Sequence, residues 1–307
     1  MPSPTLVRIT DVSPRDGLQN ESRTVPTPDK AALVRAVAAA NVDEIEVSSF
    51  VSAKWIPQLG DAAELFDILS REAAPLPLLS ALVPNDKGMI AALDVNQRAG
   101  RALIGKVAVF AAASETFSKK NINASIAESL ERFVPVIAAA HQHALPVRGY
   151  ISCVIACPFE GPIAPAAVAS LSRRLLDMGV DEIDLGDTIG AATPQTTRVL
   201  LDAVHAACPE LQGGLSAQRL LTLHLHDTFG RAGACASEAM RLGVRSFDGA
   251  VGGLGGCPYA STPGHRAPGN ISLHALRDAI ASSGLTTQLQ LKALDNAATL
   301  ATSLTRE

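Results

Sequence analysis

The segment Asp177-Met178-Gly179-Val180-Asp181 joins a leucine-rich stretch to a short apolar run that begins at Glu182. A glycine that ends a helix, followed by valine and a charged residue, is typical of the connection from a helix to a strand. The same form recurs at Asn41-Val42 and at Gly243-Val244, each time directly before another run with strand character. The recurrence predicts a helix-to-strand unit that is repeated along the chain.

Short β-rich runs alternate with alanine- and leucine-rich segments of helical length over most of the chain. The predicted strands cover residues 7–12, 44–48, 76–82, 106–110, 147–154, 182–185, 220–226 and 246–251. The predicted helices cover residues 28–40, 61–71, 87–97, 125–143, 165–178, 194–207, 231–241 and 272–282, with a terminal helix over 288–304.

Eight such alternations in about 280 residues match the size of a (β/α)₈ TIM barrel, an α/β fold. An open, doubly wound sheet is the alternative, but no GxGxxG fingerprint follows the first predicted strand. We therefore expect a single TIM-barrel catalytic domain over residues 1–307. The barrel would cover about 6–284, and an additional C-terminal helical segment would cover about 285–307.

The composition is that of a compact enzyme and disfavours nucleic-acid and membrane partners. Of the 307 residues, 47% are hydrophobic and 18% are charged, and the net charge of −4 comes without a basic block. Apolar runs are short and interrupted by charges, so we expect no transmembrane helix. Five cysteines without a CxxC pair disfavour structural zinc and a disulfide framework. Without a recognisable signal or transit segment, a cytoplasmic location is expected.

Two histidines stand two residues apart near the end of the seventh predicted strand, in Leu223-His224-Leu225-His226-Asp227. Side chains alternate across a strand, so His224 and His226 are expected to point to the same face. Paired imidazoles at the mouth of a sheet are a starting point for a divalent-metal site. A hydrogen-bonded pair of structural histidines is the alternative.

Polar residues also gather at the ends of other predicted strands, where a barrel collects its catalytic groups. They are Arg15, Asp16, Gln19, Glu46, Ser49, Arg148, Tyr150 and Asp187, with Cys257 behind a glycine-rich segment and Asn270 before the eighth helix. Structural alternatives exist for several of them. Arg15 and Asp16 could form an exposed ion pair, Glu46 could be the buried partner of an arginine, and Asp187 could cap a helix.

Asp16, His224 and His226 together offer one carboxylate and two imidazoles, and an amide oxygen such as that of Asn270 could complete the set. Oxygen and nitrogen donors without a thiolate suit Mg²⁺ or Mn²⁺ and could accept Co²⁺ or Zn²⁺. A substrate oxygen bound there would be polarised. Arg15, beside Asp16, could stabilise an enolate or thioester oxyanion.

Several of these segments resemble the 3-hydroxy-3-methylglutaryl-CoA (HMG-CoA) lyase family. The resemblance lies in Ser-Pro-Arg-Asp-Gly-Leu-Gln-Asn-Glu (13–21), Leu-Gly-Asp-Thr-Ile-Gly (185–190), His-Leu-His-Asp-Thr-Phe-Gly (224–230) and Gly-Leu-Gly-Gly-Cys-Pro-Tyr-Ala (253–260). Residues 48–58, 113–123 and 148–154 also match, so the ordered resemblance runs from about residue 7 to 300.

The resemblance implies a TIM barrel that cleaves HMG-CoA to acetyl-CoA and acetoacetate with a divalent cation. It assigns the metal to four residues, Asp16, His224, His226 and Asn270. Either Asp16 or a metal-bound water would be the base, and a homodimer is implied by analogy.

The resemblance also implies roles for the neighbouring residues. Arg15 would steady the enolate of the departing acetyl-CoA, and Glu46 would orient Arg15. Asp187 would support the site, and Cys257 would transfer a proton from a mobile loop. The residues expected to bind the acyl-CoA substrate are Arg15, Gln19, Ser49 and Tyr150.

One departure from the family pattern concerns the segment between the loop cysteine and the metal-binding amide. Asn270 follows Cys257 by thirteen residues, more than in the family pattern, and the extra residues lie within 261–268. This longer, basic loop raises the alternative of a lyase for a larger 3-hydroxy-3-alkylglutaryl-CoA, such as the isohexenyl compound. A related condensing enzyme or aldolase, and a barrel that binds acyl-CoA without turnover, are further alternatives.

Overall fold

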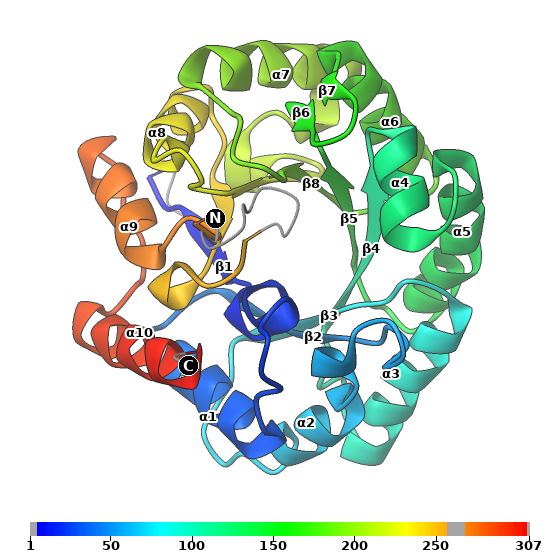
Figure 1. Ribbon diagram of the computed structural model, residues 1–307, viewed down its shortest axis with the longest axis vertical. Helices are drawn as coiled ribbons and strands as arrows, with labels where there is room; N and C mark the ends of the chain where they lie inside the picture. The colour runs from blue at the N-terminus through cyan, green and yellow to red at the C-terminus, as the bar shows by residue number, and fades with distance from the viewer. Residues whose placement is uncertain (1–4, 257–267, 306–307) are drawn as a thin grey trace.

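The computed structural model describes residues 5–256 and 268–305 and shows a closed barrel of eight parallel strands (Figure 1). Around the barrel the strands follow the order β1-β10-β9-β8-β5-β4-β3-β2. Their bounds are β1 Arg8–Asp11, β2 Glu44–Ser49, β3 Leu78–Leu82, β4 Lys106–Ala112, β5 Val147–Ser152, β8 Glu182–Asp187, β9 Leu220–Leu225 and β10 Ser246–Gly249. Every predicted strand has a counterpart, so the (β/α)₈ barrel is confirmed.

A ring of helices surrounds the barrel, one after each strand (Figure 1). The helices are α1 Thr27–Ala39, α2 Ala62–Leu69, α3 Asp86–Ala99, α5 Ile126–Gln142, α6 Pro165–Asp177, α7 Pro194–Ala207, α8 Ala232–Arg241 and α9 Leu273–Ser282. The additional C-terminal helix is α10, Leu291–Thr305, and it packs against α1. In the described part of the chain, no helix has the length and hydropathy needed to cross a membrane.

The repeated helix-to-strand connections have the backbone that the sequence predicts. After α1, α6 and α8 the chain turns at Asn41, Gly179 and Gly243, whose φ angles are 60°, 101° and 97°. A positive φ ends the helix and suits glycine, or asparagine more than other side chains. The valine that follows each turn is buried, so the chain enters the next strand against the core.

The structure adds elements that the sequence pattern did not predict. Between β4 and α5 lies α4, Glu115–Ile122, which is capped where the Ser114 hydroxyl accepts a hydrogen bond from the Phe117 amide at 3.0 Å. A small hairpin, β6 Ala156–Cys157 and β7 Gly161–Pro162, follows β5. After β1, residues Ser13–Gly17 form a single π-helical turn, labelled η1. All three lie at the carboxyl ends of the strands, where barrel loops carry function.

The inside of the barrel is charged, whereas its outer face is apolar. In β2, Ile45 and Val47 belong to the apolar core, while the alternate residue Glu44 takes part in a buried network of ions. Lys106 Nζ lies 2.6 Å from carboxylate oxygens of both Glu44 and Glu182. Removing one partner would leave a buried charge uncompensated, so each member of the network contributes to the stability of the barrel.

Candidate active site

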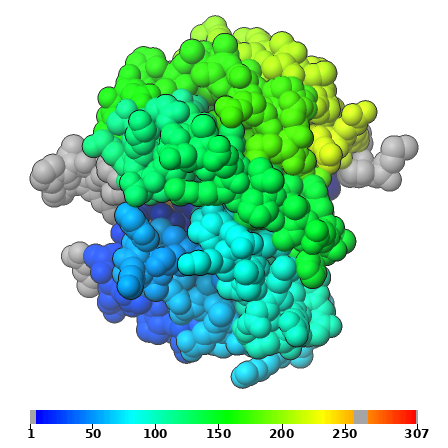
Figure 2. Space-filling model, turned by 90° about the vertical axis from the view of Figure 1, so that its right-hand side faces the viewer, coloured from blue at the N-terminus to red at the C-terminus, as the bar shows by residue number. Residues whose placement is uncertain are grey.

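A cavity of about 640 Å³ opens at the carboxyl ends of the strands, within the size range of small-molecule sites. In Figure 2 the blue surface of the early chain faces the teal surface around α4 across a hollow. The residues from the sequence analysis that line the cavity are Arg15, Asp16, Gln19, Tyr150, His224 and His226. Ser49, Glu46, Asp187 and Asn270 are buried behind this lining.

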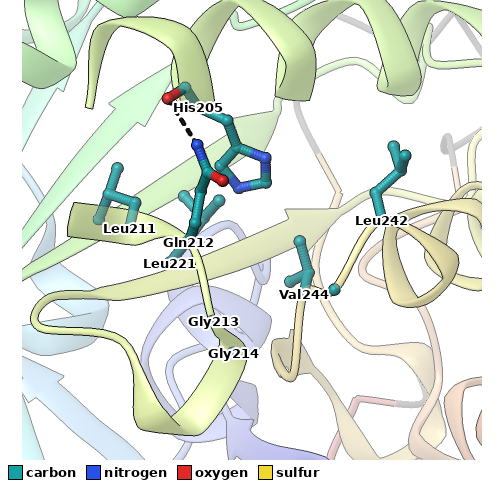
Figure 3. A pocket seen from close by; sticks show the side chains of 9 residues that line it. His205, Leu211, Gln212, Gly213, Gly214, Leu221, Leu242 and Val244 are labelled. Atoms are coloured by element: carbon teal, nitrogen blue, oxygen red, sulfur yellow. Dashed lines mark hydrogen bonds between the residues drawn. The ribbon is translucent and has the colours of Figure 1, made fainter. Parts of the chain in front are cut away.

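A smaller cavity of about 120 Å³ lies at the opposite end of the barrel, where β9 and β10 begin. Figure 3 shows the His205 imidazole beside this space, with the Gln212 amide donating a hydrogen bond of 3.0 Å to the His205 carbonyl. Leu221 and Val244 line it as well. None of the candidate residues that the structure describes lines this cavity, so the larger cavity is the candidate active site.

Three of the predicted metal ligands converge at the wall of the larger cavity. The imidazole of His224 in β9 and that of His226, directly after this strand, lie side by side, with their Nε2 atoms 3.2 Å apart. Asp16 reaches them from the π-helical turn after β1, and its Oδ2 lies 3.8 Å from His224 Nε2 and 3.9 Å from His226 Nε2. Residues more than 200 positions apart in the sequence therefore share one site.

The charges at this group suit a cation. Burial alone would raise the pKa of Asp16, but the Arg15 guanidinium and both imidazoles outweigh it and hold that pKa well below its usual range. Burial and the neighbouring His224 lower the pKa of His226 to about 4, so its imidazole is neutral at physiological pH. A carboxylate and a neutral imidazole are the protonation states in which these side chains bind metals.

The spacing of the three ligands fits one small ion. Neighbouring ligand atoms of an octahedral site at 2.0–2.1 Å from Mg²⁺ lie about 3 Å apart, close to the separation of the two Nε2 atoms. Asp16 Oδ2 would need to move inward by less than about 1 Å. The described residues thus contain a group able to hold a divalent metal.

Asn270 joins this group by a backbone bridge to His226, but its amide is turned differently from the prediction. Its Nδ2 donates to Asp16 Oδ2 at 2.8 Å and to the Leu254 carbonyl at 2.9 Å. Its Oδ1 is buried and has no hydrogen-bond partner in the described structure. A buried oxygen without a donor beside a carboxylate is a ready cation ligand, and the amide must rotate by half a turn to offer it.

Arg15 is fixed in the cavity wall by two carboxylates and a ring. Its Nε donates to Glu46 Oε2 at 2.5 Å, and its Nη1 donates to Asp16 Oδ1 at 2.9 Å. The guanidinium carbon lies 5.4 Å from the centre of the Tyr150 ring. With 6% of its surface exposed, Arg15 is no surface ion pair. Glu46 therefore contacts Arg15 in the way that an orienting residue requires.

The polar atoms of Asp187 and Tyr150 form hydrogen bonds with other groups of the protein. The two carboxylate oxygens of Asp187 accept hydrogen bonds from the amides of Ala191 and Ala192, at 2.9 and 2.8 Å, and burial raises its pKa to about 6. Asp187 thus anchors the loop before α7, but it does not cap this helix, whose N-cap is Thr193. The Tyr150 ring lines the cavity, while its hydroxyl donates to Asp248 Oδ2 at 3.3 Å.

Two predictions concern residues at the edge of what the structure describes. Cys257 and residues 261–267 lie outside the described residues. The chain is described up to Gly256, which lines the cavity and whose carbonyl accepts a hydrogen bond from Asn20 Nδ2 at 3.2 Å.

Ser49 lies at the end of β2, fully buried, and its hydroxyl has no hydrogen-bond partner in the described structure.

The sequence analysis missed Asp248, a residue that contacts the site from below. Its Oδ2 lies 3.1 Å from Nδ1 of His224. With Asp184 and His224 it forms a second group of potential ligands, fully buried. The Arg148 guanidinium lies 3.1 Å from Asp248 and 3.4 Å from Asp184, and its positive charge disfavours a cation there. The one available signal was its inward-facing position in the last predicted strand.

The chain resembles known proteins over nearly its whole length. The family model described as HMGL-like matches residues 6–301. A 3-hydroxy-3-isohexenylglutaryl-CoA/hydroxymethylglutaryl-CoA lyase of Pseudomonas aeruginosa is 47% identical over 269 residues, which cover 88% of this chain and 83% of that protein.

Solved structures of HMG-CoA lyases are also similar to this chain in fold and sequence. An HMG-CoA lyase from Brucella melitensis is 42% identical and has a TM-score of 0.87, with 98% of this chain and 99% of that one covered. An HMG-CoA lyase from Acinetobacter baumannii, in complex with coenzyme A and 3-methylmalate, is 32% identical with a TM-score of 0.85, and the match covers 99% of this chain and 92% of that one. The chain belongs to the HMGL-like family.

Proposed function

We propose that this protein is a divalent-metal-dependent hydroxymethylglutaryl-CoA lyase, which cleaves (S)-HMG-CoA to acetyl-CoA and acetoacetate. The observation that carries the proposal is the convergence of Asp16, His224 and His226 beside the buried Arg15, in a cavity at the carboxyl ends of the strands. Relatives 43–47% identical that are named for this activity support it.

The metal would be Mg²⁺ or Mn²⁺, held by Asp16, His224 and His226, with Asn270 as a fourth ligand after rotation of its amide. When bound, such a cation polarises the oxygens of the substrate and makes the C3 hydroxyl easier to deprotonate. The low pKa of Asp16 favours a role as ligand over a role as the base.

The reaction breaks the C2–C3 bond of the substrate. The C3 hydroxyl loses its proton and becomes the ketone of acetoacetate, and the bonding electron pair passes to C2 as the enolate of acetyl-CoA. Arg15, which Glu46 and Asp16 hold in place, would donate hydrogen bonds to the enolate oxygen. Cys257 is proposed to deliver the proton that converts the enolate to acetyl-CoA.

An acyl-CoA partner fits the rim of the cavity. Lys120 and Arg132 are exposed cations that line it, and they would meet the phosphates of coenzyme A. Gln19 lines the same cavity nearer to Asp16 and would contact the acyl end. A relative that was solved with coenzyme A supports this assignment.

A second candidate is the same cleavage on a larger 3-hydroxy-3-alkylglutaryl-CoA. The cavity has an apolar wall that would accommodate a longer alkyl group, formed by Leu82, Phe110, Phe117, Ile122 and Phe133. The Pseudomonas relative is named for activity on both the isohexenyl and the methyl substrate.

Acetoacetate release from HMG-CoA tests the main proposal. The purified protein should release acetoacetate with Mg²⁺ or Mn²⁺, lose the activity in EDTA, and regain it when metal is restored. If the protein binds an acyl-CoA in the presence of metal but does not cleave it, the lyase proposal is wrong and the protein is an acyl-CoA-binding protein without turnover. The ratio of kcat/KM for the isohexenyl and methyl substrates then separates the two candidates.

A further inference from the structure

We propose that Asp248 is a positioning residue that fixes the tautomer of His224, so that the Nε2 lone pair of this imidazole faces Asp16 and His226. The inference rests on the metal site of the proposed function. Asp248 in β10 and His224 in β9 are paired in register on adjacent parallel strands. Both side chains therefore point into the barrel, and Asp248 Oδ2 lies 3.1 Å from His224 Nδ1.

The chemistry of this contact determines where the imidazole proton resides. A carboxylate only accepts hydrogen bonds, so Nδ1 must carry the proton in the neutral ring. The other nitrogen is then left with a free lone pair. It lies 3.2 Å from Nε2 of His226 and 3.8 Å from Oδ2 of Asp16, where a metal would be held. A carboxylate behind a ligating histidine fixes the orientation of the ring and its tautomer.

Asp248 is itself held so that it cannot turn away from His224. Arg148 Nη1 donates to Asp248 Oδ1 at 3.1 Å, and the Tyr150 hydroxyl donates to Oδ2 at 3.3 Å. The second guanidinium nitrogen of Arg148 lies 2.8 Å from Glu182 and 3.0 Å from the Thr10 hydroxyl. These contacts come from β1, β5 and β8, so three further strands of the barrel set the position of one carboxylate.

Asp184 offers a matched control in the same buried layer. Like Asp248 it is fully enclosed, and like Asp248 it lies near Arg148 Nη1, at 3.4 Å. Asp184 interacts with this guanidinium and with Asp248, and in the described structure it makes no hydrogen bond with the imidazole. Burial and the neighbouring Asp248 raise the pKa of Asp184, whereas Arg148 and the hydrogen bond with His224 outweigh burial and lower the pKa of Asp248. An aspartate-to-asparagine change at Asp184 therefore alters a buried carboxyl but keeps the carboxylate that bonds His224 Nδ1, and the change at Asp248 removes that carboxylate.

The substitution Asp248→Asn tests the inference in the full chain. The new amide can donate to Nδ1, which would move the ring proton to Nε2 and remove the metal-binding lone pair. Titration of the EDTA-stripped protein with Mn²⁺, followed by electron paramagnetic resonance, should show affinity weakened 10- to 100-fold in Asp248→Asn. The affinity of Asp184→Asn should stay within about threefold of the wild type.

A second readout needs neither activity nor metal. The hydrogen bond with Asp248 and the charge of Asp16 outweigh burial and raise the pKa of His224, so the measurement is made at alkaline pH, where the ring is neutral. In the metal-free wild type with ¹⁵N-labelled histidine, the His224 signals, assigned by their loss in His224→Gln, should then show the Nδ1–H tautomer, and those of Asp248→Asn should show Nε2–H. A wild-type ring with its proton on Nε2, or unchanged Mn²⁺ affinity in a folded Asp248→Asn protein, would overturn the inference. If the wild type binds no Mn²⁺, the proposed metal site fails, and the tautomer measurement still decides the role of Asp248.

Discussion

Nε of Arg15 donates a hydrogen bond of 2.5 Å to Glu46, and 6% of Arg15 and 1% of Glu46 are exposed to solvent. The substitution Glu46→Gln should lower kcat for HMG-CoA cleavage about 10- to 100-fold, because the guanidinium loses the charge that orients it toward the enolate. Mn²⁺ affinity should change little, since Glu46 is not among the metal-binding group. An unchanged kcat would show that Asp16 alone can orient Arg15.

The substitution His226→Ala should weaken metal binding and activity together. It removes one of the three converging ligands, so we expect at least about a tenfold loss of Mn²⁺ affinity and a larger loss of kcat at fixed metal concentration. Isothermal titration with Mn²⁺ and an acetoacetate assay measure the two effects. The variant His205→Ala, in the small cavity at the far end of the barrel, is the control and should retain both properties.

The metal-free protein should lose stability with acid partly through His226. Its folded pKa of about 4 lies below the ordinary value of 6.5, so between these values the unfolded chain binds more protons and stability falls as the pH falls. The difference corresponds to about 3 kcal/mol over that range. In urea titrations with EDTA, His226→Gln should show a correspondingly weaker dependence of unfolding free energy between pH 4 and 6.5. Parallel wild-type and variant curves would contradict the assignment.

The substitution Cys257→Ser should lower kcat with metal affinity retained. If this thiol delivers the proton to the enolate, a hydroxyl of much higher pKa should be about 100-fold or more less effective. The control Cys208→Ser alters a thiol that follows α7 at the other end of the barrel. Full activity in Cys257→Ser would show that another group protonates the enolate.

The substitution Lys120→Ala should raise KM for HMG-CoA several-fold and leave kcat nearly unchanged. Lys120 lines the rim of the cavity, where a phosphate contact would contribute to binding of the ground state and the transition state alike. Increasing salt should reduce the difference from the wild type. The exposed Lys87 on α3 lies outside the cavity lining, and Lys87→Ala should match the wild type.

Much of the fold was predictable, because its signals are local. Helices end at the turns formed by Asn41, Gly179 and Gly243. Each turn requires a positive φ, which glycine and asparagine adopt more readily than other residues. The alternation of β9 placed His224 and His226 on one face for the same reason. The short helix α4 was not predicted, since eight mostly polar residues carry little periodicity.

The missing parts of the site depend on contacts between segments that are separate in the sequence. Asp248 stands 24 positions from His224 in the sequence, and the parallel pairing of β9 with β10 brings them into register. The rotation of the Asn270 amide is likewise set by Asp16 and the Leu254 carbonyl, which the sequence cannot place. The ion network inside the barrel was also missed, because TIM-barrel interiors are more often filled by branched apolar side chains.

That network has a consequence for how the enzyme can vary. Along β9, Thr222 bonds Glu182 at 2.6 Å in the lower layer, His224 meets Asp248 one rung higher, and His226 reaches the cavity. The residues of the candidate active site therefore pack directly on the buried polar layers below them. Substitutions deep in the barrel, far from any substrate atom, should therefore alter the chemistry as well as the stability, because the same buried ions serve both.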